Sequence, residues 1–333
     1  MDTLPATVAP AGPVCVAFSG GLDSTVLLHW LAAQPALRAR GLRAVHVHHG
    51  LQAQADDWAA HCRATCEALG LPLDVRRVRV AAEAGLGPEA AARQARRAAF
   101  AAVLRAGEWL ALAHHRDDQA ETFLLRALRA SGPDGLAAMR PLRPFAAGML
   151  WRPLLGTPRA ALLAWARAQG LHWIEDPSNA DTGLDRNFLR HRLLPLLRER
   201  WPQAEAAFAR SAGLCADAGD LLDAADDAAL AACTVDAGTL QVPALRRLPA
   251  ARRARVLRRW IERLRLPPLP AAGLAAIERE LLAARGDARA RFDWHDASVR
   301  RWRGLLHAGR GRAPLPADWQ CDLSLIHISE PTR

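Results

Sequence analysis

Short apolar runs alternate with helical patterns along the first 130 residues, and this alternation constrains the fold more than any other feature of the sequence. The runs with the length and composition of strands are residues 14–18, 43–48, 73–80 and 109–113. The segments with helical spacing are residues 25–33, 53–69, 88–106 and 117–129. Because strands and helices take turns, the pattern predicts an open, doubly wound parallel sheet of the α/β class, similar to a Rossmann fold.

The length of 333 residues predicts two domains, since a compact domain usually holds roughly 100 to 200 residues. We expect a catalytic α/β domain over residues 1–215 and a smaller, mainly helical domain over residues 216–322, in which residues 290–303 form a hairpin. The last residues, 323–333, break the Ala- and Arg-rich composition abruptly. We interpret them as an artefactual tail and allow for a truncated chain.

Arginine provides all 44 basic side chains, since the sequence contains no lysine. The lack of lysine excludes a phosphate loop of the G-K-[ST] kind and a lysine that forms a Schiff base. With 34 acidic side chains, the formal net charge is +10, which favours an anionic partner such as nucleic acid. Translation from GC-rich DNA would give the same arginine bias, so charge alone does not decide the partner.

The six cysteines include no C-x-x-C pair. Their spacing predicts neither a disulfide framework nor a zinc ribbon, and it fits a reducing cytosol. The apolar N-terminal stretch is broken by Pro and Gly and lacks a charged segment before it, so it predicts neither a signal peptide nor a membrane span. We therefore expect a cytoplasmic protein without a membrane partner, and we leave a homodimer open.

A glycine-rich turn, S-G-G-L-D-S, joins the first predicted strand to the first helix. Two glycines let the backbone approach a ligand closely, and the N–H groups that open the helix favour an anion. Asp23 would repel phosphates unless a cation lay between them, so we expect Mg²⁺ at this carboxylate. The alternative is a plain turn in which Ser and Asp cap the helix. The residues expected to bind phosphates are Ser19, Gly20, Gly21, Leu22, Asp23 and Ser24.

A second polar block, H-H-R-D-D-Q-A-E-T, begins where the fourth predicted strand ends, at residue 114. Ligands of open α/β sheets bind at this edge, beyond the carboxyl ends of the strands. On a helix, His114, Asp118 and Glu121 would share one face, which could hold a metal, a cationic substrate or a base. The alternative is a surface helix that His and Asp cap.

Both blocks resemble those of known enzymes. S-G-G-x-D-S after an apolar strand resembles the PP-loop of the N-type ATP pyrophosphatases, which cleave ATP between its α and β phosphates. H-H-x-x-D-x-x-E-T resembles the second signature of the tRNA(Ile)-lysidine synthetase family. The further blocks that match this family in order are residues 46–51, 89–96, 131–136, 152–155, 173–179 and 186–190. The resemblance is close over residues 14–202 and weakens beyond them.

The resemblance implies an ATP-dependent ligase that acts on the isoleucine tRNA with a CAU anticodon. ATP would adenylate the C2 oxygen of the wobble cytidine, and free L-lysine would then displace AMP through its ε-amine. The product, lysidine, would change codon specificity from AUG to AUA. The implied cofactors and substrates are ATP, Mg²⁺, L-lysine and tRNA(Ile).

The resemblance also suggests roles for individual side chains. Asp118 and Glu121 would hold the lysine ammonium and help to remove its proton, while His114 and Arg190 would face the phosphates or the developing charge. The expected catalytic residues are Asp23, His114, Asp118, Glu121 and Arg190, and the expected contacts with substrate or tRNA are Arg93, Arg186 and Asn187.

Seven arginines between residues 252 and 265 predict a helix of the second domain that contacts RNA phosphates. A solvated helix of an arginine-rich protein is the alternative.

The sequence departs from the family at Ala130, where the family usually has Gly, and two rival functions stay open. A tRNA thiolase would use the same adenylation, but it usually needs a catalytic cysteine pair or an iron–sulfur site; Cys62 and Cys66 are spaced C-x-x-x-C. A non-catalytic RNA-binding remnant would bind tRNA without releasing pyrophosphate from ATP.

Overall fold

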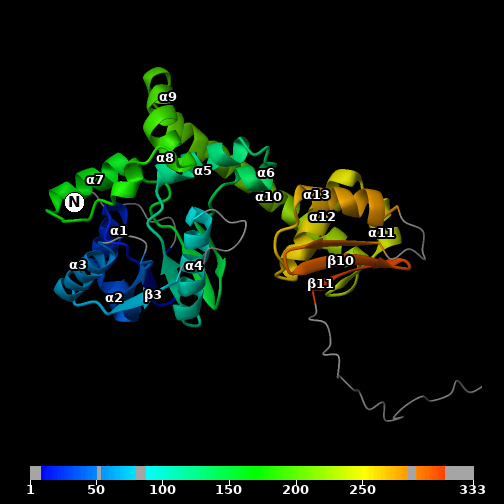
Figure 1. Ribbon diagram of the computed structural model, residues 1–333, viewed down its shortest axis with the longest axis horizontal. Helices are drawn as coiled ribbons and strands as arrows, with labels where there is room; N and C mark the ends of the chain where they lie inside the picture. The colour runs from blue at the N-terminus through cyan, green and yellow to red at the C-terminus, as the bar shows by residue number, and fades with distance from the viewer. Residues whose placement is uncertain (1–8, 51–53, 80–87, 284–289, 312–333) are drawn as a thin grey trace, which may run out of the picture. The chain divides into compact units, whose positions relative to one another are not determined.

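The computed structural model describes residues 9–50, 54–79, 88–283 and 290–311 (Figure 1). The chain divides into two compact units, Met1–Gly219 and Asp220–Arg333. The division falls within the long helix α10 (Ala204–Cys233), close to the boundary expected at residue 215. Within the described ranges, no helix has the length and apolar character that a membrane span needs. The tail at residues 323–333 lies outside them.

A six-stranded sheet organises the first unit, with the strand order β3-β2-β1-β4-β6-β5. Its strands are β1 (Val14–Ala17), β2 (Leu42–His48), β3 (Leu73–Arg77), β4 (Trp109–Ala111), β5 (Leu142–Phe145) and β6 (Gly148–Trp151). Neighbouring strands run parallel from β3 to β6, while β5 at the edge runs antiparallel to β6. The predicted open α/β sheet is confirmed, with one antiparallel edge strand added.

Helices pack on both faces of this sheet, because the central strand β1 is apolar on both sides. Val14 and Val16 belong to one core with residues of α1, α3 and α7, whereas Cys15 belongs to a second core with Phe100 of α4. Burial of consecutive residues on opposite faces is typical of a doubly wound sheet. The helices and helical turns of this unit are α1 (Leu22–Ala32), α2 (Pro35–Gly41), α3 (Ala55–Ala68), α4 (Pro88–Val103), α5 (Arg116–Ala127), α6 (Pro133–Leu136), α7 (Arg159–Ala168), η1 (Pro177–Ala180), α8 (Asp185–Phe188), η2 (Leu189–Leu193) and α9 (Leu194–Arg200).

The hairpin of β5 and β6 lies beyond residue 130, where the sequence pattern predicts no strand in this domain. Each strand has four residues, and Pro144 in β5 is typical of an edge strand. Gly148 begins β6 beside β4, where a Cβ atom would lie 2.0 Å from the carbonyl oxygen of Glu108. Strands this short, with Pro and Gly among their residues, show no alternation in the sequence, although β6 extends the parallel sheet.

The second unit combines helices with a five-stranded antiparallel sheet of order β7-β8-β11-β10-β9. Its strands are β7 (Thr234–Asp236), β8 (Thr239–Gln241), β9 (Arg291–Trp294), β10 (Ala297–Trp302) and β11 (Leu305–Arg310). Its helices and helical turn are α11 (Val242–Arg247), α12 (Ala250–Arg263), α13 (Ala271–Ala276) and η3 (Ile277–Leu281). The expected hairpin is β9–β10. The other strands were missed, because β7 and β8 have three residues each and β11 lacks β-branched side chains.

Ala130 closes the C-terminus of α5 in the left-handed conformation, with a φ of 52°. The Ser131 N–H donates to the carbonyl oxygen of Arg126 at 3.1 Å, a closure that usually places Gly at the left-handed residue. A Cβ atom disfavours this conformation by about 1–2 kcal/mol. This strain gives a physical reason for the glycine that the resembled family usually has at this position.

We predict that Ala130→Gly stabilises the first unit by up to about 1 kcal/mol, because the lost strain exceeds the entropy gained by the unfolded chain. Urea unfolding measures the difference. The matched control is Ala127→Gly, an exposed site within α5, which should destabilise the unit by about 1 kcal/mol. Equal shifts for the two variants would contradict strain at Ala130.

Candidate active site

The loop between β1 and α1 leaves backbone N–H groups available for an anion. Gly21 is the N-cap of α1 and no side chain caps the helix. The first intrahelical bond runs from the Thr25 N–H to the Gly21 carbonyl oxygen at 3.0 Å, so the N–H groups of Leu22, Asp23 and Ser24 precede it. Together with the positive end of the helix dipole, these groups form an anion site.

Gly20 fixes the shape of this loop. Its φ is 86°, and a Cβ atom there would lie 3.0 Å from Cδ1 of Ile174 and 3.2 Å from Sγ of Cys62. The Ile174 N–H donates to the Gly20 carbonyl oxygen at 2.9 Å, and the hydroxyls of Ser19 and Ser24 lie 3.0 Å apart. The predicted loop residues therefore form one turn that only glycine at this position accommodates without strain.

Asp23 has a buried carboxylate oxygen with no hydrogen-bond donor. Its Oδ1 accepts no hydrogen bond from any described residue and lies 3.8 Å from Nε of Arg159. Its Oδ2 lies 3.5 Å from Nε2 of His115. A buried acceptor without a donor suits a hard cation, so the donor set here fits the expected Mg²⁺.

His115, rather than His114, lies against Asp23. Helix α5 begins at Arg116 with His115 as its N-cap, so the expectation that His114 shares a helix face with Asp118 and Glu121 is wrong. His115 and Asp118 form a reciprocal capping box. Burial opposes protonation of His115, but the carboxylates of Asp118 and Asp23 outweigh it and raise its pKa. The H-H pair in the sequence offered no basis for choosing between the two rings.

His114 is a neutral side chain in this structure. Burial, with a further contribution from the Arg152 charge, lowers the pKa of His114 to about 3, against the opposing effect of Asp118. The Arg152 Nε–H donates to Nδ1 of His114 at 3.1 Å, which leaves the ring proton on Nε2. His114 therefore carries no positive charge at neutral pH, and its Nε2–H is what it could offer to a phosphate.

Asp118 and Glu121 of α5 share one cation, Arg190. The guanidinium donates to both oxygens of Glu121, at 2.7 and 3.1 Å, and to Oδ1 of Asp118 at 3.2 Å. Burial raises the pKa of the fully buried Glu121, and Arg190 offsets this only in part. Burial acts in the same direction on Asp118, but the charges around it, His115 foremost, lower its pKa. Arg190 lies in the π-helical turn η2, a feature that is frequent at functional sites.

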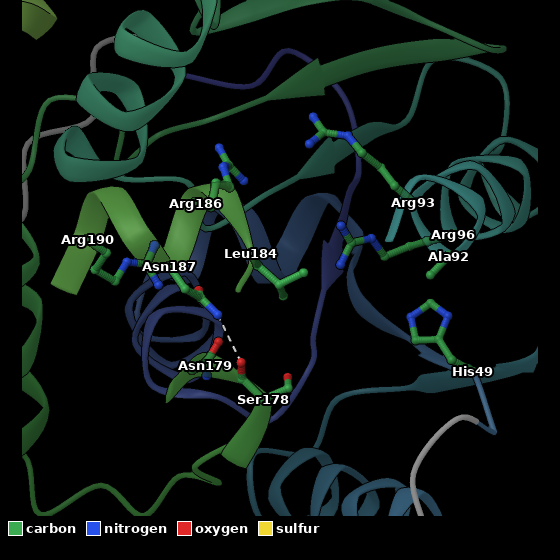
Figure 2. A pocket seen from close by; sticks show the side chains of 10 residues that line it. All are labelled: His49, Ala92, Arg93, Arg96, Ser178, Asn179, Leu184, Arg186, Asn187 and Arg190. Carbon is green, nitrogen blue, oxygen red and sulfur yellow. Dashed lines mark hydrogen bonds between the residues drawn. The ribbon is translucent and has the colours of Figure 1, made fainter. Parts of the chain in front are cut away.

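A cavity of about 300 Å³, here called the basic cavity, gathers the residues expected to contact substrate or tRNA. Figure 2 shows Arg93 and Arg96 reaching it from α4, with Arg186, Asn187 and Arg190 on the opposite side. The ten residues that line it are His49, Ala92, Arg93, Arg96, Ser178, Asn179, Leu184, Arg186, Asn187 and Arg190. None of these ten is acidic, so the cavity suits an anion such as a phosphate.

Asn187 supports the wall of the basic cavity. Its Nδ2 donates to the carbonyl oxygens of Ser178 at 2.9 Å and Asp181 at 2.8 Å. These bonds hold the turn at η1, so the side-chain amide positions this wall of the cavity.

A second cavity, of about 480 Å³, lies on the other side of Arg190 and is here called the mixed-charge cavity. Glu121, Asp117 and Glu205 contribute carboxylates to it, and Arg159 connects it to Asp23 through the 3.8 Å contact. The apolar residues that line it are Pro158, Ala160, Leu163, Leu194 and Pro202. Carboxylates, guanidinium groups and apolar side chains together suit a ligand with an amine, a carboxylate and an aliphatic chain, such as an amino acid.

Helix α12 places most of its arginines against acidic side chains. The ion pairs are Arg252–Asp226, Arg253–Glu278, Arg255–Asp226, Arg259–Asp227 and Arg263–Asp227. Five of the seven arginines that predicted an RNA-binding helix thus form ion pairs within the second unit. The contact of this helix with RNA phosphates stays a prediction, and these ion pairs would compete with it.

Cys62 and Cys66 lack the properties of catalytic thiols. Both are buried and free, and burial raises the pKa of Cys62 to about 12 and of Cys66 to about 11. Reactive cysteines have lowered pKa values, so these two fit a structural role behind the loop.

Comparisons with known proteins agree with this geometry. A family model described as "PP-loop domain" matches residues 4–197, and one described as "TilS substrate binding domain" matches residues 240–307. The solved structure of the U34-tRNA thiolase NcsA from Methanococcus maripaludis with its [4Fe-4S] cluster aligns with a TM-score of 0.51 and 18% identity, covering 64% of this chain and 73% of that one. At this identity the likeness shows the fold alone.

Relatives of much higher identity match nearly the whole chain. The tRNA(Ile)-lysidine synthase of Xanthomonas axonopodis pv. citri is 61% identical, over 95% of this chain and 71% of its own length. The tRNA(Ile)-lysidine synthase of Shigella flexneri is 49% identical, over 88% of this chain and 68% of its own length. With its loop, its two matched domains and relatives at this identity, the chain belongs to the tRNA(Ile)-lysidine synthase family, within the PP-loop enzymes.

Proposed function

We propose that this chain is an ATP-dependent ligase that joins L-lysine to C2 of the wobble cytidine of tRNA(Ile) with a CAU anticodon. The observation that carries the proposal is a buried carboxylate pair, Asp118 and Glu121, beside an uncapped phosphate loop in a member of this family. The product decodes AUA in place of AUG. ATP and tRNA are cytoplasmic, which agrees with the expected location, and a homodimer stays a prediction.

The first step is adenylation. The C2 oxygen of the cytidine attacks the α-phosphorus of ATP, the bond between the α and β phosphates breaks, and pyrophosphate leaves. The N–H groups of Leu22, Asp23 and Ser24 stabilise the phosphate charge, because they are aimed in advance and need no rearrangement. Asp23 would hold Mg²⁺ through its donor-free Oδ1, and the metal when bound neutralises phosphate charge.

The second step is attack by lysine. The ε-amine, after losing a proton, forms a bond to C2, the C2–O bond breaks, and AMP leaves. Asp118 and Glu121 hold the ammonium of lysine, and Glu121, with its raised pKa, is suited to accept a proton. The sequence has no lysine of its own, so arginine alone supplies the long basic side chains of this site.

Arg190 competes with the substrate for these carboxylates. Its guanidinium already bonds to both acids, and it lines both the basic and the mixed-charge cavity. Lysine bound from the mixed-charge cavity would release Arg190 toward the basic cavity, where Arg93 and Arg186 face the phosphates of tRNA or ATP. The acids thus stay paired before and after the amine binds.

A thiolase function remains the second candidate, because the solved thiolase shares the fold. The raised thiol pKa values of Cys62 and Cys66 favour the ligase.

One assay separates ligase, thiolase and non-catalytic remnant: purified protein with ATP, labelled lysine and the CAU-anticodon tRNA. We predict that the label enters the tRNA and that AMP forms in equal amount. Sulfur incorporation without lysine would support the thiolase, and tRNA binding without pyrophosphate release would support the remnant.

We predict that Asp23→Asn lowers the rate of pyrophosphate release by about 100-fold or more, because it removes the negative charge of the only acid in the phosphate loop. The Kd for tRNA, measured by filter retention, should stay within about two- to three-fold of the wild-type value, the change expected of a substitution that removes no contact with tRNA. The control is Asp57→Asn, an exposed acid on α3. Unchanged turnover of Asp23→Asn would remove this carboxylate from the mechanism.

We predict that Glu121→Gln raises KM for lysine by about ten-fold or more, because a charge-assisted contact with the ammonium is lost. KM for ATP should change little. Glu67→Gln, at an exposed site on α3, is the matched control, and thermal unfolding checks that both variants fold. Equal increases in both KM values would speak against a role for Glu121 toward lysine.

A further inference from the structure

The second unit presents one face of its sheet away from its hydrophobic core. Val299 and Leu306 point into a core with Trp260 of α12 and Ile277 of η3. Figure 1 shows α12 and α13 on one side of β10 and β11. Because side chains alternate along a strand, the neighbours of the inward residues lie on the opposite face.

This opposite face carries an exposed tryptophan among basic side chains. In β10, Arg300 and Trp302 alternate with the buried Val299 and Arg301, and Trp302 is 54% exposed. His307 of β11 lies directly across from Arg300 in the antiparallel register. We call this set, Arg300, Trp302, Arg303 and His307, the aromatic platform.

Trp302 and Arg303 contact each other at the turn between β10 and β11. The Arg303 guanidinium carbon lies 4.7 Å from the centre of the Trp302 ring. The Arg303 carbonyl oxygen accepts a bond from Nε of the buried Arg301 at 2.9 Å, which ties the turn to the interior of the unit. A ring held in this way needs little further ordering to receive a flat ligand.

The charge on the platform differs from that on α12. Arg300 is exposed and joins no ion pair within the part of the chain that the structure describes, whereas five arginines of α12 are paired with acids. The exposed Arg300 therefore leaves the platform with a positive charge that is available to an anion.

We infer that the aromatic platform binds an unpaired nucleotide of the tRNA substrate, whose base stacks on Trp302 while Arg300 and Arg303 contact its phosphates. Aromatic rings flanked by arginine on an open sheet are a common way of binding single-stranded RNA. A single exposed ring surrounded by charge is less suited to a protein partner, whose contacts need a contiguous apolar centre. The inference rests on the proposed function for the identity of the RNA.

The test compares Trp302→Ala, Trp302→Phe and the control Val235→Ala, which truncates a hydrophobic side chain that is also 54% exposed in the same unit. The measurement is the Kd for CAU-anticodon tRNA at fixed salt. We expect Trp302→Ala to weaken binding by about ten-fold, with Trp302→Phe close to wild type because phenylalanine also stacks. KM for ATP and for lysine should not change, and thermal unfolding should match that of Val235→Ala.

A further variant tests the charge. Arg300→Gln should weaken binding across salt concentrations and lower the slope of log K against log salt by about one. Wild-type affinity in both Trp302→Ala and Arg300→Gln would overturn the inference, and so would equal losses in Trp302→Ala and Val235→Ala. If the wild type fails to incorporate lysine while Trp302→Ala still weakens tRNA binding, the proposed function fails and the platform stands. If the wild type incorporates lysine while Trp302→Ala and Arg300→Gln both keep wild-type tRNA affinity, the proposed function stands and the platform fails.

Discussion

Anionic phosphates have to be held beside three carboxylates by a chain that contains no lysine, and the site depends on how this charge is balanced. At the phosphate loop, backbone N–H groups supply the positive end of the helix dipole, and Asp23 forms its ion pairs with His115 and Arg159. Around Asp118 and Glu121, Arg190 balances the charge together with His115 and Arg186, since buried carboxylates without a cation would take up protons. A substrate that carries its own cation can bind these carboxylates only by displacing the guanidinium of Arg190 that already pairs with them.

The fold serves this balance by bringing distant segments to one edge of the sheet. The loop follows β1, the N-cap of α5 follows β4, and these two strands are neighbours. Asp23 and His115 therefore lie in contact, although they are 92 positions apart in the sequence. Arg190 reaches Glu121 from 69 residues further along the chain, through a π-helical turn that advances its side chain toward α5. Arg190 also lines both cavities.

Much of the fold could be predicted from the sequence, because long periodic segments and the glycine loop are decided by local chemistry. Features decided by tertiary contacts could not. β5 and β6 become strands through pairing with β4 and each other, and His115 rather than His114 meets Asp23 because His115 is the N-cap of α5. Four arginines of α12, Arg252, Arg255, Arg259 and Arg263, form ion pairs with acids on α10, a pairing that no run of basic residues reveals. By contrast, Arg93, Arg186 and Asn187 do line one cavity, as the motif blocks implied.

Hydrogen–deuterium exchange of the backbone amides tests the central claim most directly, with the protein measured alone and with Mg²⁺ and a non-hydrolysable ATP analogue. If the amides of Leu22, Asp23 and Ser24 bind phosphates, their exchange slows strongly when the analogue is added, while the exposed end of α12 exchanges as before. Unchanged exchange across residues 20–25 under saturating analogue, with protection elsewhere in the first unit, would contradict nucleotide binding by this loop.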